Sequence, residues 1–143
     1  MFSTRYSTGL PELDVKDDFS RARRAQLARR ALSGVARRGA RPRHPRTLPA
    51  GGARPARAHL EAIALESVMG TVEPSAHFDA RFRPASELVR KRWESVALAH
   101  RRGRSLPPIE VRQGPDGYYV VDGRHRVSVA MATGQLQIDA WVS

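Results

Sequence analysis

The stretch Tyr118-Tyr119-Val120-Val121-Asp122-Gly123-Arg124-His125-Arg126-Val127-Ser128 decides the fold of this chain of 143 residues. Its first four residues are aromatic or β-branched and predict a strand, because such side chains suit a pleated sheet. Asp122-Gly123 predicts a tight turn. The apolar residues after Arg126 recur at helical spacing until Gly134, which predicts a helix that ends there. The stretch therefore predicts a strand that passes through a polar turn directly into a helix.

Strands are also expected on both sides of this stretch. An alternating apolar pattern over 109–112, the turn residues Gly114–Gly117 and the strand 118–121 together predict a hairpin. Residues 138–142 alternate in the same way and predict a last strand. We expect this last strand to lie at an exposed edge of the sheet, which allows a homodimer without requiring one.

Further upstream, residues 84–102 predict a helix that begins in a turn containing Pro84. Its apolar face includes Trp93, and we expect both Trp93 and Trp141 to anchor the core. Residues 60–73 fit either a short helix or a pair of strands broken at Gly70. The order of these elements predicts a small α+β domain over residues 59–143, with a mixed sheet and flanking helices.

The N-terminal part of the chain has a different composition. Residues 1–59 hold 14 basic and 4 acidic side chains, a net of +10, whereas residues 60–143 hold 11 and 10, a net of +1. Residues 1–16 are expected to form a flexible leader, and residues 17–38 a basic helix with a thin apolar stripe. Residues 39–58, rich in proline and glycine, are expected to form a disordered linker.

The composition excludes several function classes. The chain has no cysteine, which excludes a disulfide scaffold, a thiolate zinc site and a cysteine nucleophile. No apolar run approaches the roughly 18 residues of a membrane-spanning helix. The first 19 residues contain acidic side chains and no apolar stretch, so we expect no secretory signal and a cytoplasmic location.

The turn at Asp122–Arg126 is the one segment that predicts chemistry. The first N–H groups of the helix favour an anion, and Gly123 allows a ligand to approach the backbone closely. Arg124, His125 and Arg126 add cationic donors where the helix dipole disfavours them, which makes sense if a phosphate joins them. The alternative is structural: Asp122 caps the helix, and the arginines are solvated or paired with Asp116 or Asp139. From the residues alone, both interpretations stay open.

The segment from Leu106 to Gly134, with its Asp-Gly-x-His-Arg turn, resembles the ParB/sulfiredoxin-like superfamily. The resemblance extends more loosely back to about residue 60. It implies a ParB/sulfiredoxin-like fold and a turn, Gly123 to Arg126, that binds nucleotide or other phosphate groups. The nucleotide implied is CTP, ATP or ADP, with Mg²⁺, because the superfamily includes CTP-binding partition proteins, ADP-dependent serine kinases and nuclease-annotated proteins.

The chain also departs from members of this superfamily. Sulfiredoxins carry their reactive cysteine where this chain has Arg124, so reduction of sulfinic acids is excluded. Partition proteins usually carry glutamate there, and they continue into DNA-binding and dimerisation domains. Because this chain ends at Ser143, we expect no complete DNA-clamping partition protein. The Asp-Gly-x-His-Arg form is most similar to the serine-kinase-like branch.

Other residues are weaker candidates. Asp122 lies beside the predicted phosphate turn and is a candidate Mg²⁺ ligand or general base. Glu73 and Asp79 precede the long helix, where the superfamily often places functional residues. Two further pairs are also candidates: Arg81 and Arg83 for clamping a distal phosphate, and Gly103 and Arg104 for a loop that closes over the ligand. The alternatives are ordinary surface charge for Arg81 and Arg83 and a helix C-cap for Gly103.

Two functions from different classes follow. The first is a nucleotide- or phosphate-binding module, associated with DNA through residues 17–46 as a partition-like accessory or regulator. The second is a nucleotide-dependent phosphotransferase or hydrolase that uses the same turn. For the basic helix, the alternatives to DNA are a solvated tail and, less favoured, a membrane surface, for which its apolar stripe is thin.

Overall fold

The structure is a computed structural model, and it describes residues 7–35, 44–49 and 57–143. Over these residues the fold is α+β, as the sequence predicts, with three α-helices, two 3-10 helices and a mixed six-stranded sheet. In chain order the elements are α1 (Pro11–Val35), β1 (Arg46–Thr47), β2 (His59–Ala64), η1 (Leu65–Ser67), β3 (Val68–Thr71), η2 (Glu87–Val89), α2 (Arg90–Arg101), β4 (Ile109–Gln113), β5 (Tyr118–Asp122), α3 (Arg124–Ala132) and β6 (Gln137–Val142).

The sheet has the strand order β1-β3-β5-β4-β6-β2. The predicted hairpin is confirmed: β4 and β5 are antiparallel, and a 2.7 Å hydrogen bond from Gly114 N to Gly117 O closes their turn. The last strand, β6, pairs with β4 on one side and with β2 on the other. The prediction of an exposed edge at Ile138–Val142 is therefore wrong, since β2 returns along the outer side of β6 and is itself the edge.

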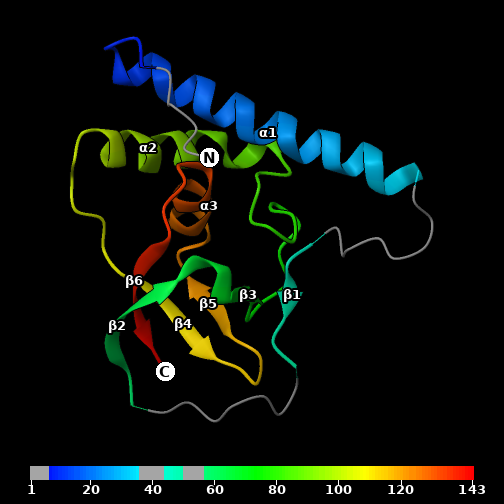
Figure 1. The fold of residues 1–143 in the computed structure, drawn as a ribbon, viewed down its shortest axis with the longest axis vertical. Helices are drawn as coiled ribbons and strands as arrows, with labels where there is room; N and C mark the ends of the chain where they lie inside the picture. The colour runs from blue at the N-terminus through cyan, green and yellow to red at the C-terminus, as the bar shows by residue number, and fades with distance from the viewer. Residues whose placement is uncertain (1–6, 36–43, 50–56) are drawn as a thin grey trace.

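The helices lie together at one side of the sheet, with α3 between the sheet and α2 and with α1 across α2 (Figure 1). Two hydrophobic clusters follow from this layering. The first joins the sheet to α3 and contains Ile63, Leu65, Val68, Phe82, Ile109, Val111, Val120, Val127, Ala130, Ala140 and Val142. The second joins α1, α2 and α3 and contains Val15, Phe19, Phe78, Val89, Trp93, Ala97 and Val129. The first helix is thus part of the packed core.

The structure corrects the expected start of the first helix. The helix begins at Pro11 rather than at Asp17, so residues 11–16 of the predicted leader are helical, while residues 1–6 and 36–38 lie outside the described part. Local contacts hold this start: Pro11 lies in the first turn, and Asp14 accepts hydrogen bonds from Thr8 N and Thr8 Oγ1, at 3.0 and 2.8 Å. A long-range ion pair then joins the helix to α2. Asp18 accepts two hydrogen bonds from Arg101 of α2, at 2.8 and 2.9 Å, and Asp14 lies 3.4 Å from the same guanidinium.

Part of the predicted linker is a strand. Arg46 and Thr47 form β1 and pair in parallel with Gly70 and Thr71 of β3. A Cβ on Gly70 would lie 1.9 Å from the carbonyl oxygen of Arg46, so the glycine admits β1 to the sheet. Gly70 is therefore inside a strand, and the break in segment 60–73 falls at η1 instead. Residues 39–43 and 50–56 lie outside the described part of the chain.

The long helix and the two tryptophans differ in part from expectation. Pro84 precedes the helix, which begins through η2, where the Ser86 hydroxyl accepts a 3.1 Å hydrogen bond from Leu88 N. Trp93 is fully buried, as predicted, but Trp141 is 42% exposed, because it faces away from the helices, out of phase with Ala140 and Val142. No helix in the described ranges is long and apolar enough to cross a membrane.

Candidate functional site

The predicted phosphate turn opens onto a cleft of about 440 Å³. Four parts of the chain meet there: the end of β5 with the start of α3, the 75–78 segment, the first half of α2, and the Leu106-Pro107 segment before β4. The lining residues are Ser75, His77, Phe78, Val89, Arg92, Val96, Leu106, Pro107, Val121, Asp122, Gly123, Arg124, His125 and Arg126. The cleft combines three arginines and two histidines with one carboxylate, and its walls are otherwise largely apolar.

Gly123 gives the turn its shape. Its φ of 116° lies in the region that favours glycine, and a Cβ there would lie 2.5 Å from Ile109 Cγ2. Gly123 is also the N-cap of α3, and no side chain caps this helix end. The first intrahelical bond in the described structure runs from Val127 N to Gly123 O, at 2.9 Å. The N–H groups of residues 124–126 therefore have no intrahelical acceptor and favour an anion.

Asp122 and Arg126 hold this turn against the start of β4. Arg126 Nη1 donates to the carbonyl oxygens of Pro107 and Pro108, at 2.7 and 2.8 Å, and Nη2 donates to Asp122 at 3.2 Å. The Asp122 carboxylate therefore pairs with Arg126 rather than capping α3, and the suggested pairing of the turn with Asp116 or Asp139 is not observed. The guanidinium of Arg126 thus donates its hydrogen bonds within the fold. For the other arginine of the turn, Arg124, no hydrogen bond or ion pair is described.

His125 lies half-buried in a positively charged setting. Its ring meets the Phe78 ring edge to face, with the centroids 5.2 Å apart. Burial, together with the charges of Arg92, Arg124 and His77, lowers the pKa of His125 to about 4. At neutral pH the ring is therefore uncharged, among cations that have little negative charge nearby. An anion in the cleft would reduce the repulsion among these cations.

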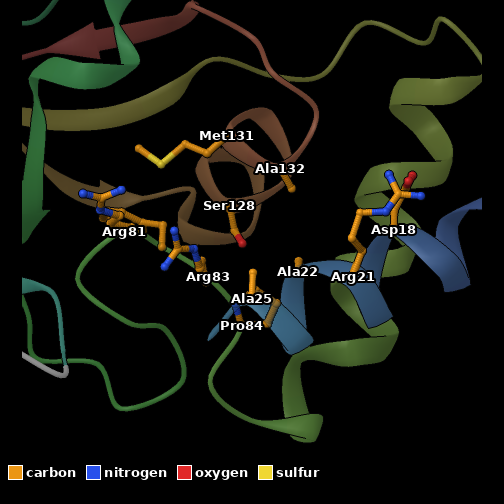
Figure 2. A pocket seen from close by; sticks show the side chains of 11 residues that line it. Asp18, Arg21, Ala22, Ala25, Arg81, Arg83, Pro84, Ser128, Met131 and Ala132 are labelled. Carbon is orange, nitrogen blue, oxygen red and sulfur yellow. The ribbon is translucent and has the colours of Figure 1, made fainter. Parts of the chain in front are cut away.

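The remaining candidate residues lie elsewhere. Arg81 and Arg83 line a different cavity, between α1 and α3 (Figure 2), and take no part in the cleft. Asp79 is buried and shapes that loop, because its Oδ1 accepts hydrogen bonds from the backbone N–H groups of Arg81 and Arg83, both at 2.9 Å. Glu73 lines none of the described cavities, and its carbonyl oxygen accepts a hydrogen bond from the Thr71 hydroxyl.

Gly103 and Arg104 follow the end of α2. Gly103 has φ 67° and donates to His100 O, and Arg104 N donates to Ala99 O, which is the geometry of a helix C-terminus. The C-cap alternative for Gly103 is thus observed. The Arg104 side chain lines a smaller hollow of about 290 Å³, which borders the cleft along Leu106, Pro107 and Arg126.

Arg92, His77 and Phe78 line the cleft although they lie outside the Leu106–Gly134 segment, as do Ser75, Val89 and Val96. A signal for Arg92 exists, since it lies three residues after Val89 and four before Val96, both of which line the cleft. For His77 and Phe78 the only signal is that they precede the helix. Their approach to His125 depends on tertiary packing, which no local pattern reports.

The superfamily resemblance also implies Mg²⁺, which proteins usually bind through one or two carboxylates together with substrate phosphates. Asp122 is the only carboxylate in the cleft, and Arg126 holds it. Within residues 7–35, 44–49 and 57–143, no group of three His, Cys, Asp or Glu side chains gathers closely enough to hold a metal ion. The cleft is instead surrounded by cations, which favour an anionic ligand.

Comparison with solved structures finds a distant likeness among its matches. Sulfiredoxin from Arabidopsis thaliana, a crystal structure, aligns with a TM-score of 0.40 and 18% identity, over 59% of this chain and 84% of that chain. No protein-family model matches the sequence, and no curated protein matches it. The residues of the cleft, rather than this likeness, indicate what the site binds.

Proposed function

We propose that the chain is a binding module for a phosphate-bearing ligand, held at Gly123–Arg126 as in the ParB/sulfiredoxin-like superfamily that the motif resembles. One observation carries the proposal: the uncapped N-terminus of α3 opens into a cleft whose positive charges outnumber its single carboxylate. Arg124 and Arg92 are the cations best placed for the ligand. Arg126 holds the turn in shape.

The ligand we favour is a nucleotide, such as CTP, ATP or ADP, rather than inorganic phosphate. Beside the turn, the cleft has apolar walls formed by Val89, Val96, Leu106 and Pro107. Its volume of about 440 Å³ falls in the range of small-molecule pockets, which combine apolar walls with a few polar groups. The phosphates would lie on the turn, and the base would lie against the apolar walls.

The experiment is a thermal-shift panel on the full chain with CTP, ATP, ADP, GTP and pyrophosphate, each with and without Mg²⁺. A ligand that binds the native state raises Tm by mass action. We expect a nucleotide-specific rise that Arg124→Gln removes and that Arg104→Gln, a matched change in the neighbouring hollow, leaves in place. No rise with any phosphate ligand would contradict the proposal.

Phosphoryl transfer or hydrolysis at the same turn is the alternative. It requires a general base, for which the sequence analysis suggests Asp122, with a side chain that is 65% exposed and paired with Arg126. The panel separates the two functions. Mg²⁺-dependent turnover of the bound nucleotide that is lost in Asp122→Asn would favour the enzyme, and binding without turnover would favour the module.

DNA association through residues 17–46 is a second proposal, supported by the charges of α1. Two acids at its N-terminal end are engaged, with Asp18 bound to Arg101 and Glu12 to Arg102, whereas Arg24 and Arg30 are exposed. Binding through phosphates would be non-specific and would weaken steeply with salt. Because α1 contributes to the core, the test uses the full chain. Arg24→Gln with Arg30→Gln should flatten the salt dependence of a gel shift, and an unchanged salt dependence would contradict the proposal.

A further inference from the structure

The sheet has two unequal edges. At one end of the strand order, β1 consists of only two residues, Arg46 and Thr47. At the other end, β2 is six residues long, and its one partner among the described strands is β6, beside which it lies in Figure 1. A very short strand is one way in which proteins protect an edge from further pairing. The edge at β2 lacks this protection and is long enough to accept another strand.

The hydrogen bonds around β6 show which backbone groups of β2 point outward. The bond from Leu65 N to Leu136 O, 2.9 Å long, continues the antiparallel register of β2 and β6 by one pair, and the bonds of Ser143 to β4 fit the same alternation. Because backbone groups alternate in direction along a strand, every second residue of β2 bonds to β6. The residues whose N–H and C=O groups point outward are Leu60, Ala62 and Ala64. Within the described part of the chain, nothing bonds to these outward groups.

An apolar pair reaches this edge on the sheet face that is turned away from the helices. Leu60 lies opposite Trp141 of β6 in the strand register. Leu60 is 55% exposed and Trp141 is 42% exposed, so both leave apolar area in contact with water. Covering such area is favourable. A second strand beside β2 would cover Leu60 from its open side.

The other face of β2 carries polar side chains. His59 Nε2 and Glu61 Oε2 are 2.9 Å apart, and both side chains are exposed. The strand thus presents an imidazole and a carboxylate two residues apart on one face. A copy of the same strand, running in the opposite direction, presents the two groups in reverse order. An antiparallel copy can therefore place an imidazole opposite each carboxylate.

When a strand pairs in antiparallel fashion with its own copy, one residue faces itself, and this residue sets every other contact. With Glu61 at the centre, two carboxylates would face each other, which is unfavourable. With Ala62 at the centre, Glu61 would face the buried Ile63. With Leu60 at the centre, Leu60 faces Leu60, and each Glu61 faces His59 of the second copy. Of these three registers, the last gives both the apolar and the polar side chains suitable partners.

We propose that two copies of the chain form a dimer through antiparallel pairing of their β2 strands, centred on Leu60. The outward N–H and C=O groups of Leu60 bond to the same groups of the second copy, so that the two sheets continue as one. Trp141 and Leu60 of both copies then form a single apolar row across the dimer. Because one strand pair buries little area, the dimer is reversible and depends on concentration. No residue of β2 lines the cleft at Gly123–Arg126, so this proposal does not depend on phosphate binding.

The first test is sedimentation of the full chain over a wide range of concentration, where we expect a monomer–dimer equilibrium. Leu60→Lys should weaken dimerisation about tenfold or more, because it removes the apolar contact and places like charges opposite each other. Leu88→Lys provides the matched control, since Leu88 is 83% exposed and lies in η2, and it should dimerise like the wild type. A chain that stays monomeric at every concentration would overturn the proposal, as would unchanged dimerisation of Leu60→Lys.

Cross-linking tests the register without depending on a charge change. The chain has no cysteine, so a single introduced cysteine reports on one contact. Leu60→Cys should form a disulfide-linked dimer on air oxidation, because residues that face each other in an antiparallel pair have a Cα separation that a disulfide can span. Ala62→Cys and Leu88→Cys should cross-link about tenfold more slowly, since the two copies of residue 62 would lie about 13 Å apart along the strands. Faster cross-linking at Ala62 than at Leu60, or equal rates at Leu60 and Leu88, would overturn the proposal.

Discussion

Arginine side chains are prominent both where α1 packs on α2 and at the N-terminus of α3, but the two regions differ in how these arginines are paired. At the interface, the Arg101 side chain is 11% exposed and donates hydrogen bonds to both oxygens of Asp18, and hydrogen bonding to this carboxylate raises the arginine pKa. At the start of α3, Arg124 and Arg92 face a cleft with one carboxylate, which Arg126 already holds. The first arrangement satisfies its charges within the fold, and the second leaves positive charge for a ligand.

The difference teaches which charges stabilise this fold and which serve binding. A paired and buried arginine fixes the position of a helix, and removal of its partner lowers the stability of the fold. An arginine held near other cations, beside a histidine whose pKa is lowered to about 4, reduces stability unless an anion arrives. Mutations at the two places should therefore act on different quantities, stability at the interface and binding at the cleft.

The largest expected effect is at the interface. Phe19 is fully buried against Trp93, with ring centroids 5.5 Å apart, so Phe19→Ala should lower the free energy of unfolding by about 3–5 kcal/mol. Urea denaturation measures it, with Leu32→Ala, an exposed position on the same helix, as the control. A loss under about 1 kcal/mol would mean that α1 is not part of the cooperative core.

Gly123→Ala should have a smaller effect on stability and a large effect on binding. The φ of 116° and the contact of a new Cβ with Ile109 should together cost about 1–3 kcal/mol and displace the turn. Denaturation and a nucleotide titration on the same variant measure both. Gly134→Ala, where φ is also positive but no atom lies within 4 Å, provides the matched control, with lost stability and retained binding.

Arg124→Gln should lower nucleotide affinity and leave stability almost unchanged. Stability should change by no more than about 0.5 kcal/mol, since no described residue pairs with this side chain. Affinity for a nucleotide should fall about tenfold, as expected for one charge-assisted hydrogen bond. Calorimetric titration and denaturation of one preparation test this, and a large stability loss with intact binding would reverse the assignment.

The smallest effect is a pH dependence. The folded state holds the pKa of His125 at about 4, below the ordinary value of 6.5 that returns on unfolding. The unfolded state therefore binds more protons between these values, so stability should fall as the pH drops from about 6.5 to about 4. Tm profiles of the wild type and His125→Gln measure it, and the variant should lose less. The lowered pKa values of Asp14 and Asp116 act below this window, because these carboxylates protonate only at more acidic pH.

Local patterns were enough to predict the part of the fold that carries the cleft. The hairpin of β4 and β5, the turn at Gly123 and the end of α3 near Gly134 depend on residues that are neighbours in sequence. The same holds for the residues of the turn, since a strand that runs into a helix through Asp-Gly places them together. The direction of the Arg126 side chain, toward Pro107 and Pro108, has no such local signal.

What could not be predicted depends on distant partners. The packing of α1 on α2 depends on Arg101, which binds Asp18 from 83 residues further along the chain. The strand β1 forms because Gly70 leaves room for it, and β6 is interior because β2 returns beside it. Arg81 and Arg83 are predicted to clamp a distal phosphate because they lie in the segment before the long helix, but they line a cavity that shares no residue with the cleft.

The most direct test of the central claim, that the turn at Gly123–Arg126 binds phosphate groups, is a titration of the ¹⁵N-labelled chain with pyrophosphate. The amides of Arg124, His125 and Arg126 would donate hydrogen bonds to the anion, so their NMR signals should shift saturably. The signals of Ser128 and Ala132 should shift far less. Saturable shifts confined to these three amides and lost in Arg124→Gln would support the account. Amides that do not move while pyrophosphate binds elsewhere, or no binding at all, would contradict it.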